Sequence, residues 1–338
     1  MIDIVYIERD ALGYPMTGRA LKALPKAEQV IIDSWEDVFY RKNQNFRLQK
    51  GAQKLILAVN RSGFIRKGSK NCQNFGADSF YYCSPVRNCI SGCEYCYLQG
   101  MLSSANLLAF VNTGDCFEEL RHLLKAENIG KERKMLLPVT YDNDLYTLEK
   151  VFGLVGIWAD FLSNERPEGL TVEIRTKCGT KSFAEAAKKA AEYMVFTWSV
   201  APEENIKQFE PRTSPLRARI DAALHSADAG QRVRLAFDPL LAVGCDWQKG
   251  YDDLCALLAE TGLSRKVEAV GVGCFRIPAD YLKIMRKNAP ESPLAFDRYE
   301  YKNGTNGYPD EKQALVTGYV KQKLEECGVP HEKIYSYS

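Results

Sequence analysis

Three cysteines in one short segment, Cys89, Cys93 and Cys96, have the side chains and spacing of an iron–sulfur cluster site. Three thiolates can each bind one iron of a 4Fe–4S cube, and the fourth iron is then left without a protein ligand. Sites with four cysteines close the cluster, so a site with three keeps a coordination position open for a small molecule. The alternative is zinc, but zinc takes four ligands, and the sequence has no second pair at zinc spacing.

An open coordination position is typical of radical S-adenosylmethionine (SAM) enzymes, in which SAM binds the fourth iron. An aromatic residue commonly precedes the last cysteine in those enzymes, and Tyr95 occupies that place here. We therefore expect two cofactors, a 4Fe–4S cluster and SAM.

The composition is that of an ordinary globular protein. The 338 residues are 46% hydrophobic and 26% charged, which predicts one large domain with additions. No apolar run approaches the roughly 18 residues of a membrane span, and the N-terminal residues lack a signal-peptide pattern. The eleven cysteines would suggest disulfides in an oxidising compartment, but an iron–sulfur cluster needs a reducing one. These features predict a cytoplasmic protein with no membrane partner.

The net charge of +2 conceals a basic stretch. Residues 41–70 contain nine lysines and arginines and no acidic residue. A solvated surface normally mixes both signs, whereas like-charge blocks often bind nucleic acid. We favour a polyanionic partner for this stretch, although a solvated face of a small N-terminal domain remains the alternative.

Alternation of β-rich and helix-compatible segments predicts an α/β fold. Residues 1–75 are expected to form a small basic α/β domain, with strands at 2–7 and 55–59 and a helix from 25 to 40. Residues 76–277 contain β-rich runs at 80–83, 107–111, 135–140, 171–176, 194–200, 233–237 and 267–272. Helix-compatible segments lie between them at 117–126, 145–161, 183–192, 216–229 and 251–260. This alternation indicates a parallel sheet, here a partial barrel of the (β/α)6 type, followed by a C-terminal extension at 278–338.

Polar residues follow the predicted strands at the ends where an α/β barrel places its active site. The cysteine segment follows the first strand, and the other strand ends carry Tyr141, Asp142, Asn143, Asp144, Lys177, Ser199, Asp238, Cys274 and Arg276. A single polar strand end can serve solvation alone, but this many around a cluster segment predict one coherent site.

Several stretches carry a specific family resemblance. The run Cys93-Glu94-Tyr95-Cys96-Tyr97-Leu98-Gln99 resembles the cluster motif of the spore photoproduct lyase family, which continues with Tyr-Leu-Gln after its last cysteine. Segments 173–177, 199–202, 232–239 and 271–276 are similar to further segments of that family. The resemblance covers residues from about 80 to 300, and the Tyr-Leu-Gln extension separates it from most radical SAM families.

The resemblance implies repair of the thymine dimer that ultraviolet light forms in spore DNA. In that family, reduction of the cluster cleaves SAM to a 5′-deoxyadenosyl radical, which takes a hydrogen from the lesion, and a relay returns hydrogen and regenerates SAM. Damaged DNA and a reducing flavodoxin- or ferredoxin-like donor are the implied partners, in the spore core. The SAM contacts implied by matching positions are Lys177, Ser199, the backbone near Ala236, and Asp142. Structural alternatives are an ion pair for Lys177 and a helix cap for Ser199.

The sequence departs from the family where many members carry a hydrogen-donating cysteine. That segment reads Pro-Val-Thr-Tyr-Asp at 138–142 and has no thiol. Some members of the family lack this cysteine and place a donor upstream of the cluster, which makes Cys72 the first candidate, with Cys274, Cys178 and Tyr141 as rivals. The matching relay tyrosines are Tyr95 and Tyr97. Because buried free cysteine is common as a small apolar residue, a structural role for Cys72 stays open.

The lesion contacts are expected near the C-terminus. Residues 298–304 predict a strand entering a turn, whose basic and aromatic members Arg298, Tyr299 and Lys302 suit a lesion-binding hairpin. Arg276 is a further candidate for a phosphate or base contact. An ordinary edge hairpin is the structural alternative.

Two other functions remain open from the sequence. One is a radical SAM enzyme of the same fold acting on another nucleic acid or on a peptide, and the missing relay cysteine keeps this alternative open. The other is a non-catalytic nucleic-acid-binding protein with a structural cluster, which the matches at Lys177 and Ser199 disfavour.

Overall fold

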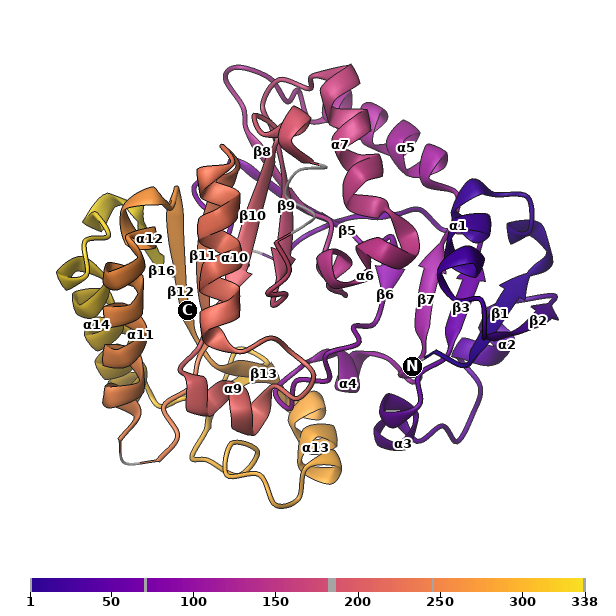
Figure 1. The fold of residues 1–338 in the computed structure, drawn as a ribbon. Helices are drawn as coiled ribbons and strands as arrows, with labels where there is room; N and C mark the ends of the chain where they lie inside the picture. Colours follow the sequence, from indigo (N-terminus) through magenta and orange to yellow (C-terminus); the bar gives the residue numbers. More distant parts are fainter. Residues whose placement is uncertain (1, 70–71, 182–186, 245, 337–338) are drawn as a thin grey trace.

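The structure, a computed structural model, describes residues 2–69, 72–181, 187–244 and 246–336. Its strands form a five-stranded sheet, an eight-stranded sheet and a small three-stranded sheet. The five-stranded sheet lies at one side of the molecule, and the eight-stranded sheet forms its centre and opposite side (Figure 1). No helix of the described ranges is both long and apolar enough to span a membrane.

The five-stranded sheet has the order β2-β1-β3-β7-β6. The strands are β1 Ile4–Glu8, β2 Glu28–Ile32, β3 Leu55–Ala58, β6 Val86–Arg87 and β7 Leu107–Phe110. Its helices are α1 Pro15–Ala23, α2 Glu36–Phe39, α3 Phe46–Gly51 and α5 Thr113–Ala126. Strands β3 and β7 are buried along their whole lengths, as central strands of a covered parallel sheet must be.

Two expectations about this part of the chain were wrong. The run at 107–111 was placed in the barrel, but β7 pairs with β3 of the first sheet. The helix expected from 25 to 40 is instead strand β2, paired with β1, followed by the short helix α2. The β-branched run at 30–32 favours an extended backbone once a neighbouring strand offers hydrogen bonds.

A single cut at residue 75 does not separate the two sheets. Strand β4 (Ile65–Lys67) precedes this position and pairs with the large sheet, whereas β6 and β7 follow it and belong to the first sheet. The chain therefore crosses between the sheets more than once, and the cluster segment lies between β6 and β7 of the first sheet, after the crossing from β5.

The eight-stranded sheet has the order β16-β12-β11-β10-β9-β8-β5-β4. Its strands besides β4 are β5 Ser79–Cys83, β8 Met135–Pro138, β9 Leu170–Thr176, β10 Met194–Ser199, β11 Arg232–Leu240, β12 Ala269–Cys274 and β16 Ile334–Ser336. The six strands from β5 to β12 are mutually parallel, with β4 antiparallel at one edge and β16 parallel at the other. The predicted partial (β/α)6 barrel is confirmed.

The barrel has the helices that the sequence pattern predicted, with two differences, and two shorter helices at 203–209 and 263–266 that it did not predict. They are α6 Leu145–Phe152, α7 Leu154–Glu165, α9 Glu203–Phe209, α10 Leu216–Asp228, α11 Trp247–Thr261 and α12 Leu263–Lys266. The single helix expected at 145–161 is divided at Gly153, whose φ is +70°. Residues 183–186 of the helix expected at 183–192 lie outside the described residues, and Lys188–Ala190 form a 3-10 turn.

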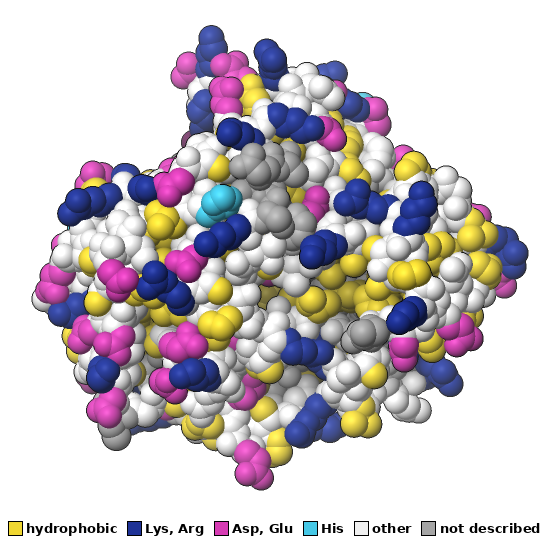
Figure 2. Space-filling model, in the orientation of Figure 1, with side chains coloured by type: hydrophobic (Ala, Val, Ile, Leu, Met, Phe, Trp, Pro, Cys, Tyr) yellow, Lys and Arg dark blue, Asp and Glu magenta, His cyan; other side chains and the backbone are white. Residues whose placement is uncertain are grey.

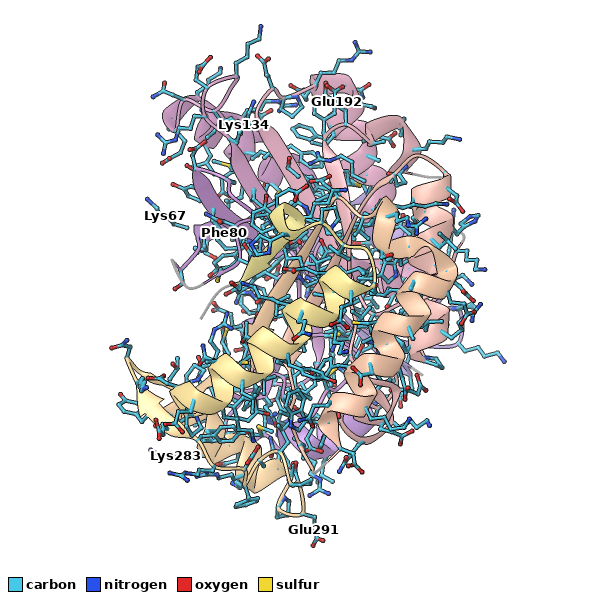
Figure 3. All side chains as sticks on the ribbon, turned by 90° about the vertical axis from the view of Figure 1, so that its left-hand side faces the viewer. Lys67, Phe80, Lys134, Glu192, Lys283 and Glu291 are labelled. Carbon is cyan, nitrogen blue, oxygen red and sulfur yellow. The ribbon has the colours of Figure 1, made fainter. Side chains whose placement is uncertain are left out.

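The C-terminal extension closes two sides of the barrel. Strand β13 (Arg276–Pro278) forms the small sheet with β14 (Glu300–Lys302) and β15 (Thr305–Gly307), so the predicted hairpin exists. Helix α13 (Ala279–Asn288) follows β13 and packs against α4 (Leu98–Met101), directly after the cluster segment. Helix α14 (Asp310–Glu326) runs across the β12 side of the sheet (Figure 3).

Candidate iron–sulfur and SAM site

The cluster segment is a loop that several other parts of the chain hold in place. All three cysteines are partly buried. The carbonyl oxygen of Cys89 accepts hydrogen bonds from the Lys50 ammonium and from Gln53 Nε2, the latter at 3.2 Å. The amide of Glu94 donates to the carbonyl of Phe209 at 2.8 Å. The loop is thus fastened to the first sheet at one end and to the barrel at the other.

Gly92, in the middle of the loop, is required for two reasons. Its φ is +70°, a conformation that costs an L-residue with a side chain free energy. A Cβ atom here would also lie 2.7 Å from Arg212 Nη2 and 3.1 Å from Lys50 Cε. The glycine therefore lets two basic side chains approach the backbone between the first and second cysteines.

The three thiols of the loop are the candidate ligands of the open cluster. Within the described residues, no group of three or more cysteine, histidine or acidic side chains converges on one point as the ligands of one ion would. Thiolates on separate irons of a cube need not converge, because each binds its own metal. The cysteines that can hold the cluster are Cys89, Cys93 and Cys96, and zinc finds no four-ligand set among the described residues.

Lys177, at the end of β9, lies beside the cluster loop. Its Nζ is 3.5 Å from Cys93 Sγ, 3.1 Å from Glu210 Oε1 and 4.7 Å from the centre of the Tyr95 ring, and it also contacts the Tyr95 hydroxyl. Asp144 accepts the Lys177 backbone N–H at 2.9 Å, which fixes the strand end. The structural alternative for Lys177 is thus realised, because an acidic partner is present.

Glu210 and Arg219 complete this polar cluster, and sequence reasoning missed both. Glu210 accepts hydrogen bonds from the Tyr95 hydroxyl and from Arg219 Nη2, the latter at 2.5 Å. Arg219 is fully buried on α10 and also donates to the Ser199 carbonyl at 2.9 Å. No motif marks either residue. The weak signal available was an arginine on the inward face of an amphipathic helix, which must find a partner.

Electrostatic interactions within this polar group of side chains keep Glu210 and Lys177 charged. Burial opposes ionisation of Glu210, but Lys177 and Arg219 outweigh burial and lower the pKa of Glu210 to about 2. Burial also opposes charge on Lys177, yet Cys93 and Glu210 raise its pKa. Burial raises the pKa of Cys93 to about 12, against the opposing effect of Lys177. Lys177 therefore stays a cation next to a cluster ligand, where it can attract a carboxylate.

The other two expected SAM contacts are at neighbouring strand ends. Ser199 ends β10 and is buried, and Ala236 lies beside it on β11, with its carbonyl bonded to the Val200 amide at 2.9 Å. Ser199 does not cap the next helix, since Pro202 holds the N-cap position of α9 and no side chain caps it. The helix-cap alternative for Ser199 was therefore wrong.

A second polar group lies on the β5 and β8 side of the loop. The Tyr97 hydroxyl donates to the Tyr141 carbonyl at 2.7 Å and lies 3.4 Å from Asp142 Oδ1. Asp142 is buried and accepts from Ser84 Oγ at 2.8 Å, and burial raises its pKa. Asp142 thus lies on the tyrosine side of the loop, apart from the Lys177 cluster.

Cys72 belongs to the same group as Tyr97. Its Sγ is 3.6 Å from the Tyr141 hydroxyl, and the Tyr141 ring centre is 6.0 Å from that of Tyr97. The rival thiols have other surroundings: Cys274 Sγ is 3.4 Å from Thr317 Oγ1, and Cys178 Sγ accepts from the Thr180 amide. Tyr95 contacts Lys177 and Glu210, so the two matching tyrosines serve different groups.

Of the residues predicted to contact the DNA lesion, some are partly buried in the protein and others are exposed on its surface. Arg276 pairs through β15 with the hairpin, so the structure brings them into one small sheet. Tyr299 donates its hydroxyl to the Leu294 carbonyl at 2.6 Å and packs on Phe275, which gives it a structural task. Arg298 is exposed, and Lys302 pairs with Asp310 at 2.5 Å. Tyr301 is the aromatic residue that the hairpin exposes, at 66%, and the site prediction did not include it.

The basic stretch at 41–70 is not one continuous face. Lys54 pairs with Asp3, Arg61 pairs with Glu8 and Asp10, and Lys50 turns inward to the cluster loop. On the face shown in Figure 2, basic side chains are spread over the surface and are not gathered in one block. The remaining exposed lysine and arginine side chains of this stretch lie mainly near α3.

Comparisons with known proteins agree along the whole chain. A sequence model of the family described as spore photoproduct lyase matches residues 1–334. A relative of that name from Bacillus subtilis (strain 168) is 25% identical over 351 residues, which cover 99% of this chain and 94% of the relative. Another, from Geobacillus sp. (strain Y412MC61), is 24% identical over 325 residues, covering 90% and 88%.

Solved structures show the same fold. A spore photoproduct lyase double mutant with bound AdoMet and dinucleoside spore photoproduct has a TM-score of 0.82 at 20% identity, covering 99% of this chain and 98% of its own. A spore photoproduct lyase complexed with dinucleoside spore photoproduct has a TM-score of 0.81 at 19% identity, with the same coverage.

Proposed function

The chain belongs to the spore photoproduct lyase family, and we propose that it restores two thymines from spore photoproduct in damaged DNA by SAM radical chemistry. The observation that carries the proposal is the arrangement around the cluster loop. A partly buried lysine, Lys177, lies 3.5 Å from Cys93 on one side, and a tyrosine–thiol group lies on the other. This arrangement supports binding of a charged cofactor and return of a hydrogen atom within one enclosed site.

The chain's own residues divide the work. Cys89, Cys93 and Cys96 hold the cluster, which when reduced supplies the electron that cleaves SAM. Lys177 attracts the SAM carboxylate, and because Glu210 holds it at 3.1 Å, cofactor binding must compete with or share this ion pair. Ser199 and the backbone of Ala236 line the neighbouring strand ends. The buried surroundings exclude water from the reacting atoms.

Cys72 is the proposed hydrogen donor. Its S–H hydrogen atom would pass to the thymine-centred radical, forming the new C–H bond and leaving a thiyl radical at Cys72. Tyr141, 3.6 Å away, would then donate its hydroxyl hydrogen atom to the thiyl radical, and Tyr97 would donate a hydrogen atom to Tyr141, so that the radical moves toward the cofactor side. This role is supported by the contact with Tyr141, which Cys274 and Cys178 do not make in the described structure.

The experiment is an anaerobic reaction of the reconstituted enzyme with dinucleotide spore photoproduct and SAM. Thymine recovery is expected, and 5′-deoxyadenosine without thymine would overturn the lyase assignment in favour of another radical SAM substrate. Absence of SAM cleavage after dithionite reduction would favour a non-catalytic cluster protein. Cys72→Ala is expected to divert the substrate radical into trapped products, with Cys178→Ala as the matched thiol control.

We also infer that lesion DNA lies over the hairpin β14–β15. The exposed aromatic ring of Tyr301 and the cations Arg298 and Lys302 suit stacking and phosphate contact. Arg276 lies in the same small sheet and is the proposed inner contact. Extruding a damaged dinucleotide costs less than extruding intact bases, which favours the lesion.

The reducing partner is proposed to be an acidic flavodoxin- or ferredoxin-like protein, in the reducing interior of the cell or spore. The supporting feature is α3, where Arg47 is exposed, Leu48 is 73% exposed and Lys50 contacts the cluster loop. Arg47→Glu should slow cluster reduction by a reduced flavodoxin but not by dithionite, which needs no docking site. Equal rates with both reductants would exclude this face. Weaker binding of lesion DNA would assign it to the substrate.

A further inference from the structure

The loop that carries Cys72 is anchored inside the barrel by the ring of Phe75. Phe75 is 9% exposed and forms a small apolar cluster with Leu136 of β8 and Ala269 of β12. Its ring lies edge-on to Tyr335 of β16, with ring centres 5.6 Å apart. Gln73 also reaches β16, donating to the Tyr335 carbonyl at 3.4 Å. The segment next to Cys72 is thus fastened to β16, at one edge of the large sheet, and to β8, on the far side of the sheet from β16.

The barrel is shaped to receive this ring. Gly271 of β12 faces it, and a Cβ atom there would lie 3.1 Å from Phe75 Cζ and 3.6 Å from Gln73 Cγ. On the other side the guanidinium of Arg234 is 4.4 Å from the ring centre. Arg234 is itself only 6% exposed and is held by Glu268 at 2.6 Å. A glycine and a buried cation therefore leave a fitted space for one aromatic side chain.

The backbone of the loop is strained where the ring is held. Phe75 has a φ of +49°, which is unusual for a bulky residue without glycine's freedom. Such a conformation persists only where the surroundings over-determine it. Here the Phe75 amide donates to Gln73 Oε1 at 2.8 Å, and Asn74 bonds the Gly76 amide at 3.1 Å and the Ala77 carbonyl at 2.8 Å. These hydrogen bonds form a rigid turn directly after Cys72, and the turn fixes the position of the loop that carries this residue.

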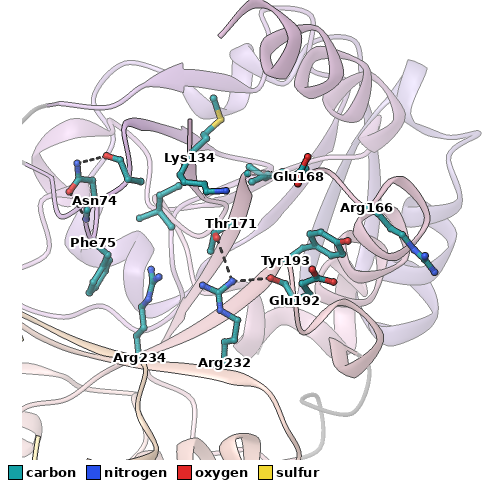
Figure 4. A pocket seen from close by; sticks show the side chains of 16 residues that line it. Asn74, Phe75, Lys134, Arg166, Glu168, Thr171, Glu192, Tyr193, Arg232 and Arg234 are labelled. Atoms are coloured by element: carbon teal, nitrogen blue, oxygen red, sulfur yellow. Dashed lines mark hydrogen bonds between the residues drawn. The ribbon is translucent and has the colours of Figure 1, made fainter. Parts of the chain in front are cut away.

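The anchor is at the end of the barrel away from the cofactor residues. Phe75 and Arg234 line a cavity of about 700 Å³ at the amino ends of β8, β9 and β11 (Figure 4). In Figure 4 the Arg234 side chain extends toward Phe75. Lys177 and Ser199 follow or end their strands at the carboxyl side. A change at Phe75 therefore reaches the reaction through the loop, without touching SAM or cluster ligands.

We propose that Phe75, held between Gly271 and Arg234, is a positioning residue that sets Cys72 against Tyr141 for hydrogen return. The inference rests on the proposed role of Cys72. A donor thiol must meet a short-lived radical in one geometry, so a loosely held loop would let the radical react elsewhere. The strained turn at 73–77, which three hydrogen bonds hold, provides that rigidity without contacting the reacting atoms.

The test compares Phe75→Leu, Cys72→Ala and the double variant in the reconstituted enzyme. The measured quantity is trapped or abortive product per thymine recovered from dinucleotide lesion. Phe75→Leu should raise this ratio about fivefold, which is about 1 kcal/mol of lost preference for the productive geometry. On the Cys72→Ala background the same change should have no further effect. Gly271→Ala, which pushes the ring from the other side, should act like Phe75→Leu. Leu258→Ala, in the outer helix α11, is the stability control and should leave the ratio unchanged.

A second readout uses the cluster-free protein. Alkylation of Cys72, followed by mass mapping of its peptide, should be about fivefold faster in Phe75→Leu than in the wild type if the loop loosens by that amount. If the product ratio is unchanged in Phe75→Leu but rises in Cys72→Ala, only the anchoring role of Phe75 is overturned. An unchanged ratio in Cys72→Ala would instead refute the donor assignment. A ratio that rises equally in Leu258→Ala would reduce the effect to general destabilisation.

Discussion

Replacing Glu210 by glutamine removes a negative charge that lies between two cations, the buried Arg219 and the partly buried Lys177. Glu210 is 3% exposed and binds Arg219 at 2.5 Å and Lys177 at 3.1 Å. Its pKa falls from the ordinary value of 4.5 to about 2, which corresponds to about 3 kcal/mol. Removing one partner of a buried ion pair costs about 3–5 kcal/mol, because the other charge stays buried without compensation. We therefore expect Glu210→Gln to lose about 3–5 kcal/mol of unfolding free energy at pH 7.

Glu268 provides a matched control. It also bridges two arginines, with Arg232 and Arg234 each at 2.6 Å, and its pKa is likewise lowered to about 2. Its side chain is 31% exposed, however, so solvent screens the charges. Glu268→Gln should therefore cost only about 1–2 kcal/mol.

The assay is equilibrium urea denaturation of the cluster-free variants across pH. The folded pKa of Glu210 is depressed, so its contribution is complete above pH 4.5 and is lost as pH falls toward about 2. The stability gap between wild type and Glu210→Gln should narrow over that window. A gap at pH 7 no larger than that of Glu268→Gln, or one independent of pH, would refute the reasoning about burial.

Three other outcomes are expected. Gly92→Ala places a methyl group 2.7 Å from Arg212 and imposes left-handed strain of about 1–2 kcal/mol, so iron bound per chain after reconstitution should fall, and the unfolding free energy in urea should fall by no more than that strain. Tyr97→Phe removes the 2.7 Å bond to the Tyr141 carbonyl and should lower turnover about tenfold, measured as thymine formed per minute, with unchanged iron content. Tyr301→Ala should weaken lesion DNA binding by about 1–3 kcal/mol in a fluorescence titration, while thermal stability moves by less than about 0.5 kcal/mol because the ring is 66% exposed.

The sequence by itself determined the parts of the protein that are local in the chain. The spacing of Cys89, Cys93 and Cys96 specified the open cluster motif, because ligand spacing within one loop is a property of consecutive residues. The apolar runs predicted seven strands for the barrel, and six of them are its parallel strands, because the burial of a strand shows in the pattern of its own residues. The Tyr97-Leu98-Gln99 continuation pointed to the family that the full-length match then established.

Only the tertiary structure decided which distant residues meet. A strand's sheet partner is not encoded within the strand, so β7 was assigned to the barrel although it pairs with β3. The Glu210–Arg219 pair joins the end of α9 to α10, and no spacing rule predicts a partner across a turn. In the same way, Phe75 lies among β8, β11, β12 and β16.

The cluster loop shows both contributions. Its three cysteines were readable from the sequence, but their surroundings were not. Lys177, Lys50 and Arg212 come from three separate segments, and their charges converge on the loop because it contacts both the first sheet and the barrel. The electrostatics and packing of the loop depend on that convergence of distant segments. The sequence therefore predicted the cluster chemistry, whereas only the tertiary structure showed the charged residues that surround the cluster loop.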